Sequence, residues 1–200
     1  AALALVAFVA RRWLPDPVVW LGTARSVREK RARAAALPAD LLTRRDLSRL
    51  LIARGRPRDA VPLLEEAIAK GLHDPETFYL LGLSRLRSGD PAGSLEPFVR
   101  TAQANGRFLM GDPYVAAAQA LTLLARHEEA EDALDHALAV NSSRVDAHVA
   151  LARVRTARGD LAGARRAYDK AIETWGDLPD FMRWKTLSSY LAARWGRWAR

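Results

Sequence analysis

The sequence predicts an all-α solenoid built from about four helix pairs, because one pattern of residues recurs along the chain at a nearly constant step. A column of small residues repeats at intervals of 34, 36 and 34 residues, and three further columns keep the same intervals. The four columns are Ala60, Ser94, Ala130 and Ala164; Leu64, Phe98, Leu134 and Tyr168; Ala67, Thr101, Ala137 and Ala171; and Gly55, Gly89, Ala125 and Gly159. Repeats of this length are typical of stacked helix pairs, in which each pair buries its apolar face against the next.

Composition and charge narrow the classes of function. Half of the 200 residues are hydrophobic, enough for a sizeable core, and the absence of cysteine excludes disulfides, cysteine-ligated zinc and thiol catalysis. The formal charge of +8 lies mostly at the ends: residues 1–40 carry +4, residues 41–175 carry +1 and residues 176–200 carry +3. A nucleic-acid partner would require positive charge along the repeat body. Basic ends beside tryptophans therefore favour an anionic membrane surface, and nucleic acid is the weaker alternative.

Residues 1–14 are predicted to be the end of a transmembrane anchor. Their first part, AALALVAFVA, is uninterrupted apolar sequence, but as a helix it would be only about 15 Å long, roughly half of a hydrocarbon core. Arg11, Arg12 and Trp13 follow, as basic and aromatic residues do at a membrane interface. The alternative is a buried helix, or an exposed start of the chain that packs on the repeats.

Residues 15–40 are predicted to be a basic linker helix that ends before Pro38. Pro15 and Pro17 interrupt the preceding segment, and the helix has an apolar start followed by a strongly basic body. With a membrane-embedded anchor, the positive-inside rule places this linker and the repeats on the cytoplasmic side of a bacterial inner membrane. The alternative is a solvated helix that caps the first repeat.

The four repeats are expected at residues 41–74, 75–110, 111–144 and 145–176. Thr43 followed by Asp46 has the spacing of a capping pair and marks the first of these helices. Asp74 before Pro75 marks the start of the second repeat, with an N-cap carboxylate and a proline in the first helical turn. Glycines then end the helices within each pair.

The two additional residues of the 36-residue step fall in a longer link, residues 105–113, with the sequence NGRFLMGDP. Phe108, Leu109 and Met110 are apolar within this loop-like segment, and we expect them to fill the seam between two repeats. The alternative is an exposed apolar loop that a partner covers.

Residues 177–200 are predicted to be a basic, tryptophan-rich capping helix. Its large apolar residues fall three or four positions apart and form one stripe. The stripe comprises Trp184, Leu187, Leu191, Trp195 and Trp198. Because an array of repeats leaves an apolar face open at its end, we expect this stripe to pack on the last repeat, with basic residues outward. Contact with a membrane interface or a protein partner is the alternative.

The repeat pattern resembles that of tetratricopeptide repeat proteins. That family places a small residue where the first helix of a pair approaches the second, and uses the small–large–small spacing of the columns above on the second helix. The small residues of the first helices are Ser48, Gly82, Ala118 and Ala152. The resemblance covers roughly residues 43–175 and implies a right-handed solenoid with a non-catalytic role in protein–protein interaction. An anchor, a basic linker and a few repeats also resemble, in layout, small bacterial membrane-anchored tetratricopeptide proteins that act as assembly or quality-control scaffolds.

The resemblance also implies a binding groove, because the first helices of this family line a concave surface that binds peptide segments. The residues that it places there are Arg45, Arg49, Tyr79, Leu83, Arg87, Gln119, Thr122, Arg153 and Thr156. A groove of mixed basic and apolar character favours an acidic amphipathic partner segment, although some of these residues alternatively pack against neighbouring helices. Contacts with the membrane or a partner are expected at the two ends, at Arg11, Arg12, Trp13, Trp20, Trp184, Trp195 and Trp198.

Patterns that carry catalysis do not appear in the sequence. The histidines show no spacing of metal ligands, and no glycine-rich phosphate loop or nucleophile elbow occurs. We therefore predict no enzyme activity, no cofactor, no metal site and no small-molecule substrate. The expected function is a membrane-tethered scaffold that assembles or stabilises a membrane protein complex. The alternative is a structural subunit of a larger membrane complex.

Overall fold

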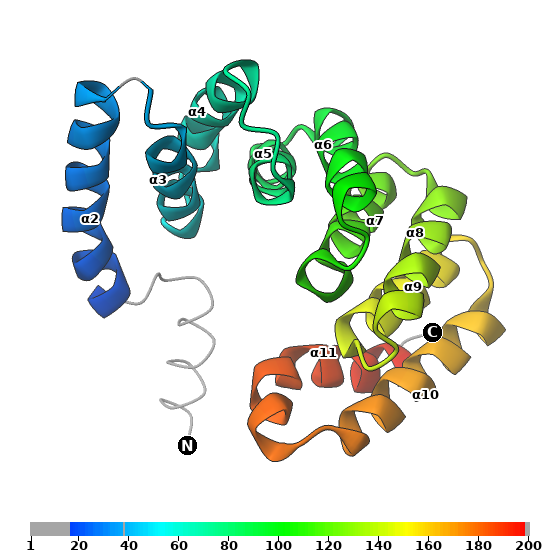
Figure 1. The fold of residues 1–200 in the computed structure, drawn as a ribbon. Coiled ribbons are helices and arrows are strands. Elements are labelled where there is room, and N and C mark those ends of the chain that lie inside the picture. The colour runs from blue at the N-terminus through cyan, green and yellow to red at the C-terminus, as the bar shows by residue number, and fades with distance from the viewer. Residues whose placement is uncertain (1–16, 38, 199–200) are drawn as a thin grey trace. The chain divides into compact units, whose positions relative to one another are not determined.

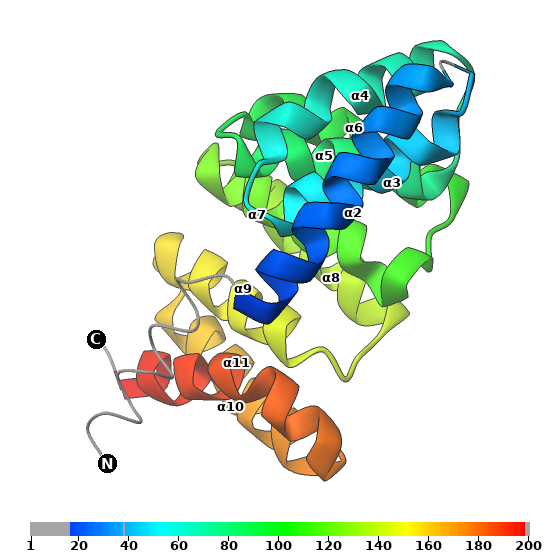
Figure 2. The same ribbon diagram turned by 90° about the vertical axis from the view of Figure 1, so that its left-hand side faces the viewer.

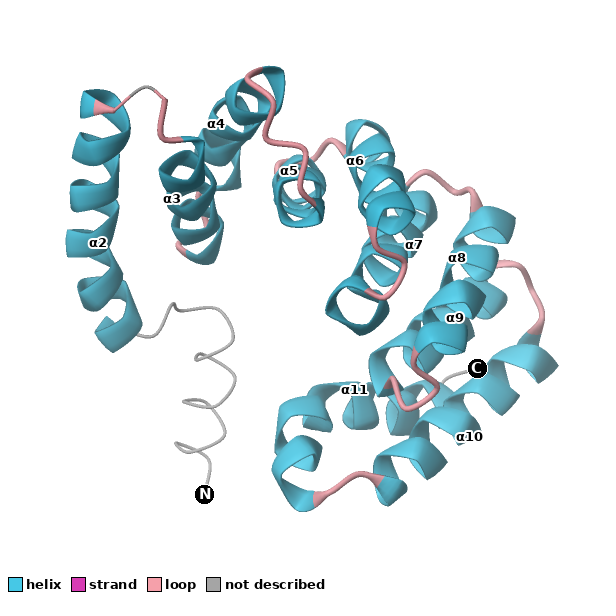
Figure 3. Cartoon of the chain, in the orientation of Figure 1, coloured by secondary structure: helices cyan, strands magenta, loops and turns pink. Residues whose placement is uncertain are grey.

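The computed structural model describes residues 17–37 and 39–198, and the regular structure of these ranges is helical (Figure 1 and Figure 3). The chain divides into two compact units between Ser88 and Gly89, and each unit is described by itself. The first contains α2 (Pro17–Ala36), α3 (Leu41–Ala53), α4 (Pro57–Ala69) and α5 (Pro75–Arg87). The second contains α6 (Pro91–Ala104), the short 3₁₀ helix η1 (Phe108–Gly111), α7 (Asp112–Leu123), α8 (His127–Val140), α9 (Val145–Ala157), α10 (Leu161–Asp177) and α11 (Asp180–Trp198).

The amino-terminal end is described from α2 onward. The anchor predicted at residues 1–14, with Arg11, Arg12 and Trp13, lies outside the described residues. Within residues 17–37 and 39–198, no helix combines the length and the apolar composition needed to cross a bilayer. The predicted linker helix is present as α2 and ends before Pro38, and it packs on α3 with Val27 and Ala34 buried.

Aspartate carboxylates begin several of the described helices. Each accepts a hydrogen bond from a backbone N–H of the first turn, which otherwise has no partner inside the helix. These N-cap residues are Asp40, Asp74, Asp90 and Asp160. The capping pair expected from Thr43 and Asp46 is wrong, because Asp40 is the N-cap of α3 and accepts from the backbone N–H of Thr43 at 3.0 Å.

The repeated columns form the contact surface between helices in both units. The Ala60 and Ala67 columns and the larger Leu64 column are almost completely buried, from 0 % exposed at Ala60 to 7 % at Tyr168. Within the first unit α4 packs against both α3 and α5, and within the second unit each of α7, α8, α9 and α10 packs against its neighbours in sequence. Small residues let the helix backbones approach closely, and the large residue between them fills the remaining space.

The turns between paired helices share one backbone conformation. Gly55, Gly89 and Gly159 have positive φ angles of 72°, 91° and 83°, and Ala125 has a φ of 58° at the equivalent position. Glycine adopts this left-handed region without strain, whereas alanine does so at a cost of roughly 1–2 kcal/mol. The turn position of each repeat therefore requires a left-handed backbone conformation. In the third repeat this position is occupied by Ala125, which is less favourable there than glycine.

The orientation of α11 differs from the sequence prediction. The helix lies beside α10 and also contacts α9 (Figure 2), but the predicted inner stripe faces outward, with Trp184 78 % exposed and Trp195 and Trp198 each 79 % exposed. The side that packs is made of small residues. Ala193 is fully buried, and a Cβ atom added to Gly196 would lie 2.3 Å from the ring of Tyr168. Close approach of the helices selects this side, because an indole ring does not fit there.

The link at residues 105–113 also differs from the prediction. Leu109 and Met110 are 53 % and 60 % exposed, so they do not fill the seam between repeats. Their φ angles are 44° and 56°, in the left-handed region. Gly111 occupies the seam instead, since a Cβ atom added there would lie 3.4 Å from the carbonyl oxygen of Ala137. The chain backbone itself packs closely at this point and leaves no room for a large side chain.

Candidate partner-binding surface

The residues predicted to line the groove lie on the first helix of each pair. Arg45 and Arg49 lie on α3, and Tyr79, Leu83 and Arg87 lie on α5, all in the first unit. Gln119 and Thr122 lie on α7, and Arg153 and Thr156 lie on α9, in the second unit. The structure thus brings these residues together as two separate sets.

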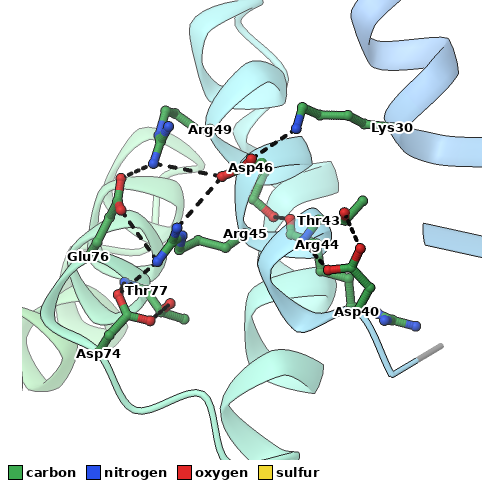
Figure 4. Close-up of polar contacts among 11 residues, drawn as sticks. Lys30, Asp40, Thr43, Arg44, Arg45, Asp46, Arg49, Asp74, Glu76 and Thr77 are labelled. Atoms are coloured by element: carbon green, nitrogen blue, oxygen red, sulfur yellow. Dashed lines mark hydrogen bonds and ion pairs between the residues drawn. The ribbon is translucent and has the colours of Figure 1, made fainter. Parts of the chain in front are cut away.

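In the first unit, Arg45 and Arg49 belong to a network of ion pairs (Figure 4). The guanidinium of Arg45 lies 3.4 Å from Asp74 and 3.5 Å from Glu76, while Arg49 pairs with Glu76 as well. Asp46 accepts from Lys30 of α2 at 2.9 Å and lies within 4.0 Å of both arginines. Three helices, α2, α3 and α5, are therefore joined by alternating charges.

The electrostatics of the network favour the ionised form of Asp46 and of Asp74. Burial alone raises the pKa of Asp46, but the hydrogen bond and charge of Lys30 and the charges of both arginines outweigh it and lower the pKa. The same balance applies to Asp74, whose pKa is lowered by hydrogen bonds from Thr77 and by Arg45 despite its burial. Three cations face three carboxylates, so this part of the predicted groove has little net charge for an acidic partner.

The sequence reasoning identified the two arginines but missed their partners. The sequence predicts Asp74 as an N-cap and residues 15–40 as a basic linker, and neither pattern pairs Asp74, Glu76 or Lys30 with a residue of α3. One sequence signal indicates this pairing. Arg45 and the N-cap Asp74 belong to the first helices of consecutive repeats, and such helices lie side by side in repeat arrays. The contact of α3 with α5 confirms that arrangement within the first unit.

The remaining predicted residues on α5 differ in exposure. Tyr79 and Leu83 are half-buried, and Arg87 is exposed. Arg87 lines an open hollow of about 470 Å³ together with the turn from Gly55 to Asp59. The Arg87 side chain thus lies near the end of the helix pair, and Leu83 is a half-buried apolar residue of the same helix.

In the second unit, the two predicted threonines use their hydroxyl groups within their own helices. Thr122 donates to the carbonyl oxygen of Ala118 at 2.7 Å, and Thr156 donates to that of Ala152 at 2.8 Å. Gln119 and Arg153 are exposed. Among the groove residues predicted in this unit, these two side chains offer polar groups to a partner.

Other polar contacts of the second unit stabilise the repeats. Glu131 of α8 accepts from Arg155 at 2.8 Å and from Arg158 at 2.6 Å, and both arginines offset the burial that would raise its pKa, so that the pKa is lowered. Arg144 bridges Asp112 and Asp146 and also donates to the carbonyl oxygen of Met110 at 3.2 Å. Burial opposes the charge of Arg144, yet the two carboxylates outweigh it and raise the pKa.

The side chains of the described part of the chain do not form a group that would hold a metal ion. Histidine, aspartate and glutamate nowhere gather in a set of three that would suit a metal ion within residues 17–37 and 39–198. His148 is buried and its Nε2 lies 3.1 Å from the carbonyl oxygen of Ser142. Burial lowers the pKa of His148, which keeps the ring neutral in a packing position.

Comparison with known proteins gives the same architecture. The sequence profile described as tetratricopeptide repeat matches residues 45–109 and 115–179. The crystal structure of MamA protein superposes with a TM-score of 0.72 at 17 % identity, covering 79 % of this chain and 88 % of that one. YrrB, described as a TPR protein with an unusual peptide-binding site, superposes with a TM-score of 0.69 at 14 % identity and 84 % coverage of each chain. No curated protein sequence matches this chain.

Proposed function

The chain belongs to the tetratricopeptide repeat family, and from that premise we propose that it is a membrane-tethered scaffold that holds a segment of a protein partner on its first helices. The fold supports a role in protein–protein interaction, as in relatives such as YrrB, whose description includes a peptide-binding site. The partner, in this proposal, is part of a membrane protein complex that the scaffold assembles or stabilises.

Side chains at one repeated position of the first helices carry the proposal, two of them in each unit. Arg49, Leu83, Gln119 and Arg153 are equivalent positions, because they keep the 34-, 36- and 34-residue intervals of the packing columns. Each packing column holds either a small residue or a large apolar residue in every repeat. The position of Arg49, in contrast, changes from basic to apolar to amide to basic along the four repeats. Within each unit, positions that packing does not constrain are available to recognise side chains of a bound segment.

The charge at this repeated position supports a partner of particular composition. Arg49 is already paired with Glu76, whereas Arg153 is exposed and Leu83 is apolar. We therefore propose a segment that places an acidic or carbonyl group near Arg153 of the second unit, while Leu83 of the first unit favours an apolar residue of a partner. Rim charges of this kind act more on the association rate and on specificity than on total affinity.

Photo-crosslinking tests the face of binding. A photoreactive amino acid placed at Gln119 reports on the proposed surface, and one at Asp132, exposed on the second helix of the same pair, is the matched control. We expect a defined protein to be captured from cells at Gln119 and not at Asp132. We also expect Arg153→Glu to reduce that capture without changing the thermal unfolding midpoint. Equal capture at both positions, or no effect of Arg153→Glu, contradicts the proposal.

The tether to a bacterial inner membrane, with the repeats in the cytoplasm, is proposed from the sequence of residues 1–40. Apolar residues followed by Arg11, Arg12 and Trp13 and then by the basic α2 have the order expected of an anchor and its cytoplasmic flank. Protease added to intact spheroplasts should leave the repeats uncut, and protease added to inverted vesicles should remove them. Digestion in the first preparation contradicts this orientation, and recovery of the protein in the wash after alkaline extraction contradicts the tether.

A further inference from the structure

The outward side of α11 carries a row of five large apolar side chains, interrupted once by Ser188, which we call the tryptophan face. Besides the three exposed tryptophans, Phe181 is 68 % exposed and Leu191 is 52 % exposed. The row consists of Phe181, Trp184, Ser188, Leu191, Trp195 and Trp198. Successive members are separated by three or four residues, so they follow one side of the helix along its whole length. Single exposed apolar residues are ordinary, but a row of this size marks a contact surface.

The rotation of α11 about its own axis is fixed by the opposite side. Ala193 is fully buried, and Gly196 lies against the ring of Tyr168 with no space for a Cβ atom. Trp175 of α10 stacks on Tyr190 with ring centroids 4.0 Å apart, and its indole N–H donates to the carbonyl oxygen of Arg183 at 3.3 Å. The helix cannot turn its tryptophans inward without losing these contacts, so the tryptophan face remains exposed in the folded chain.

Beyond Asp180, the first residue of α11, which pairs with Arg183 at 3.2 Å, the charges beside the tryptophan face are positive. No acidic residue occurs from Phe181 to Trp198. Lys185 and Arg194 lie on either side of the row on a helical projection and are both exposed. Arg194 donates to the hydroxyl of Tyr190 at 3.3 Å and retains its full charge. Farther from the row, Arg197 is paired with Asp169.

We propose that the tryptophan face binds the interfacial layer of an anionic phospholipid bilayer, with α11 lying parallel to the membrane surface. Indole rings combine an apolar body with a polar N–H group and concentrate at the level of lipid headgroups. The apolar row enters the boundary of the acyl chains, while Lys185 and Arg194 pair with lipid phosphates. This contact is separate from the repeated position on the first helices and from the amino-terminal tether, and it does not depend on either of them.

Two other occupants fit the observations less well. A second copy of α11 would bring Lys185 and Arg194 next to the same basic residues, and the one carboxylate of each helix, Asp180, is already paired with Arg183 at 3.2 Å. An acidic partner helix would satisfy those charges, but interlocking helix seams use aliphatic side chains at the inner positions. Three of the five large residues here are tryptophans, which is the composition of an interfacial helix.

The absence of cysteine from the chain permits a direct test with a single reporter. A full-length Ser188→Cys variant, labelled with an environment-sensitive fluorophore, places the probe in the middle of the tryptophan face. Ser143→Cys, exposed in the link between α8 and α9, is the matched control. Both proteins are mixed with vesicles of phosphatidylcholine alone, and with vesicles that also contain about 30 mol% phosphatidylglycerol.

The expected result is a blue shift of the probe at position 188 with the anionic vesicles, and a much smaller one with phosphatidylcholine. The probe at position 143 should not respond to either. Raising the salt concentration to about 0.5 M should weaken the response at position 188 at least several-fold, because the basic flanks act through screened charges. Adding Trp184→Ser, Trp195→Ser and Trp198→Ser to the labelled chain should abolish it.

The controls separate membrane contact from loss of folding. Leu123→Ser with Leu161→Ser removes exposed apolar residues elsewhere in the second unit and should leave the response unchanged. Lys185→Glu with Arg194→Glu should remove the preference for anionic vesicles while the helical circular dichroism stays constant. If the full chain floats with anionic vesicles but the probe at position 188 remains in water, the proposal is wrong. A blue shift that rises with protein concentration without lipid also overturns it, in favour of a second copy.

Discussion

The packing positions of one repeat and the tryptophan face of α11 both place residues three or four positions apart on a helix. The packing positions are buried, whereas the tryptophan face is exposed. Leu134, in a packing column, is fully buried, whereas Trp195 is 79 % exposed. The periodicity of apolar residues therefore identifies the stripe of a helix but does not by itself decide whether that stripe faces the core.

The side-chain volumes explain the difference. In the repeats, small residues flank each large one, so two helices approach closely and enclose the large side chain. In α11 the small residues Ala193 and Gly196 lie on one side and the indole rings lie on the other. The helix packs through its small side because that side permits backbone contact with Tyr168, and the bulky side is left outward.

The largest expected difference in stability is that between a substitution in a packing column and one on the tryptophan face. Leu134→Ala should lower the free energy of unfolding by about 2–5 kcal/mol, because it creates a cavity among buried residues. Trp195→Ala removes a larger side chain but should change the free energy of unfolding by less than about 0.5 kcal/mol, since that side chain is mostly in water. Urea unfolding followed by far-ultraviolet circular dichroism measures both. Similar losses in the two variants would mean that the tryptophan face is packed.

A second prediction tests which side of α11 is the inner one. Gly196→Ala should destabilise the fold by about 1–3 kcal/mol, because the added methyl group collides with the ring of Tyr168. Gly176→Ala is the matched control in α10, where the added methyl group meets nothing within 4 Å. This control should be neutral or stabilising by up to about 1 kcal/mol through its helix propensity. A neutral Gly196→Ala variant in thermal unfolding would refute the described rotation of α11.

A third, smaller effect concerns the aromatic contact that holds α11 on α10. Tyr190→Leu removes the ring that stacks on Trp175 and should cost about 0.5–1.5 kcal/mol beyond the area that leucine still buries. Tyr190→Phe keeps the ring and should leave the stability nearly unchanged. Chemical unfolding monitored by circular dichroism distinguishes the two variants, and equal stabilities for leucine and phenylalanine would show that stacking does not matter there.

The smallest expected effect on stability concerns the turns between the paired helices of a repeat. Ala125→Gly should stabilise the chain by roughly 0.5–1 kcal/mol, because relief of left-handed strain exceeds the added backbone entropy of the unfolded state. Gly159→Ala should destabilise it, since the equivalent turn has a φ of 83° although a Cβ atom there would meet nothing within 4 Å. Opposite signs in the two melting temperatures are required, and the same sign in both would mean that the turn position is not governed by backbone conformation.

The sequence was sufficient for the repeats and insufficient for the polar contacts of the candidate site. Columns such as Ala60 and Leu64 are repeated four times, and each repetition strengthens the signal. The pairing of Arg45 with Asp74 joins residues 29 positions apart and occurs in one place only, so no internal repetition reveals it. The exposure of Leu109 and Met110 differs from the expectation that they fill a seam, because the spacing of apolar residues does not reveal their left-handed φ angles of 44° and 56°.

By itself the sequence determined the all-α repeat architecture, its turn positions and the membership of each packing column, because these depend on local spacing and backbone conformation. Only the tertiary structure decided that Arg45 and Arg49 are already paired with carboxylates and that the tryptophans of α11 face outward. Both outcomes depend on which surfaces of neighbouring helices come close enough to exclude a side chain or to neutralise a charge. That distance is a property of the packed helices and not of any one segment.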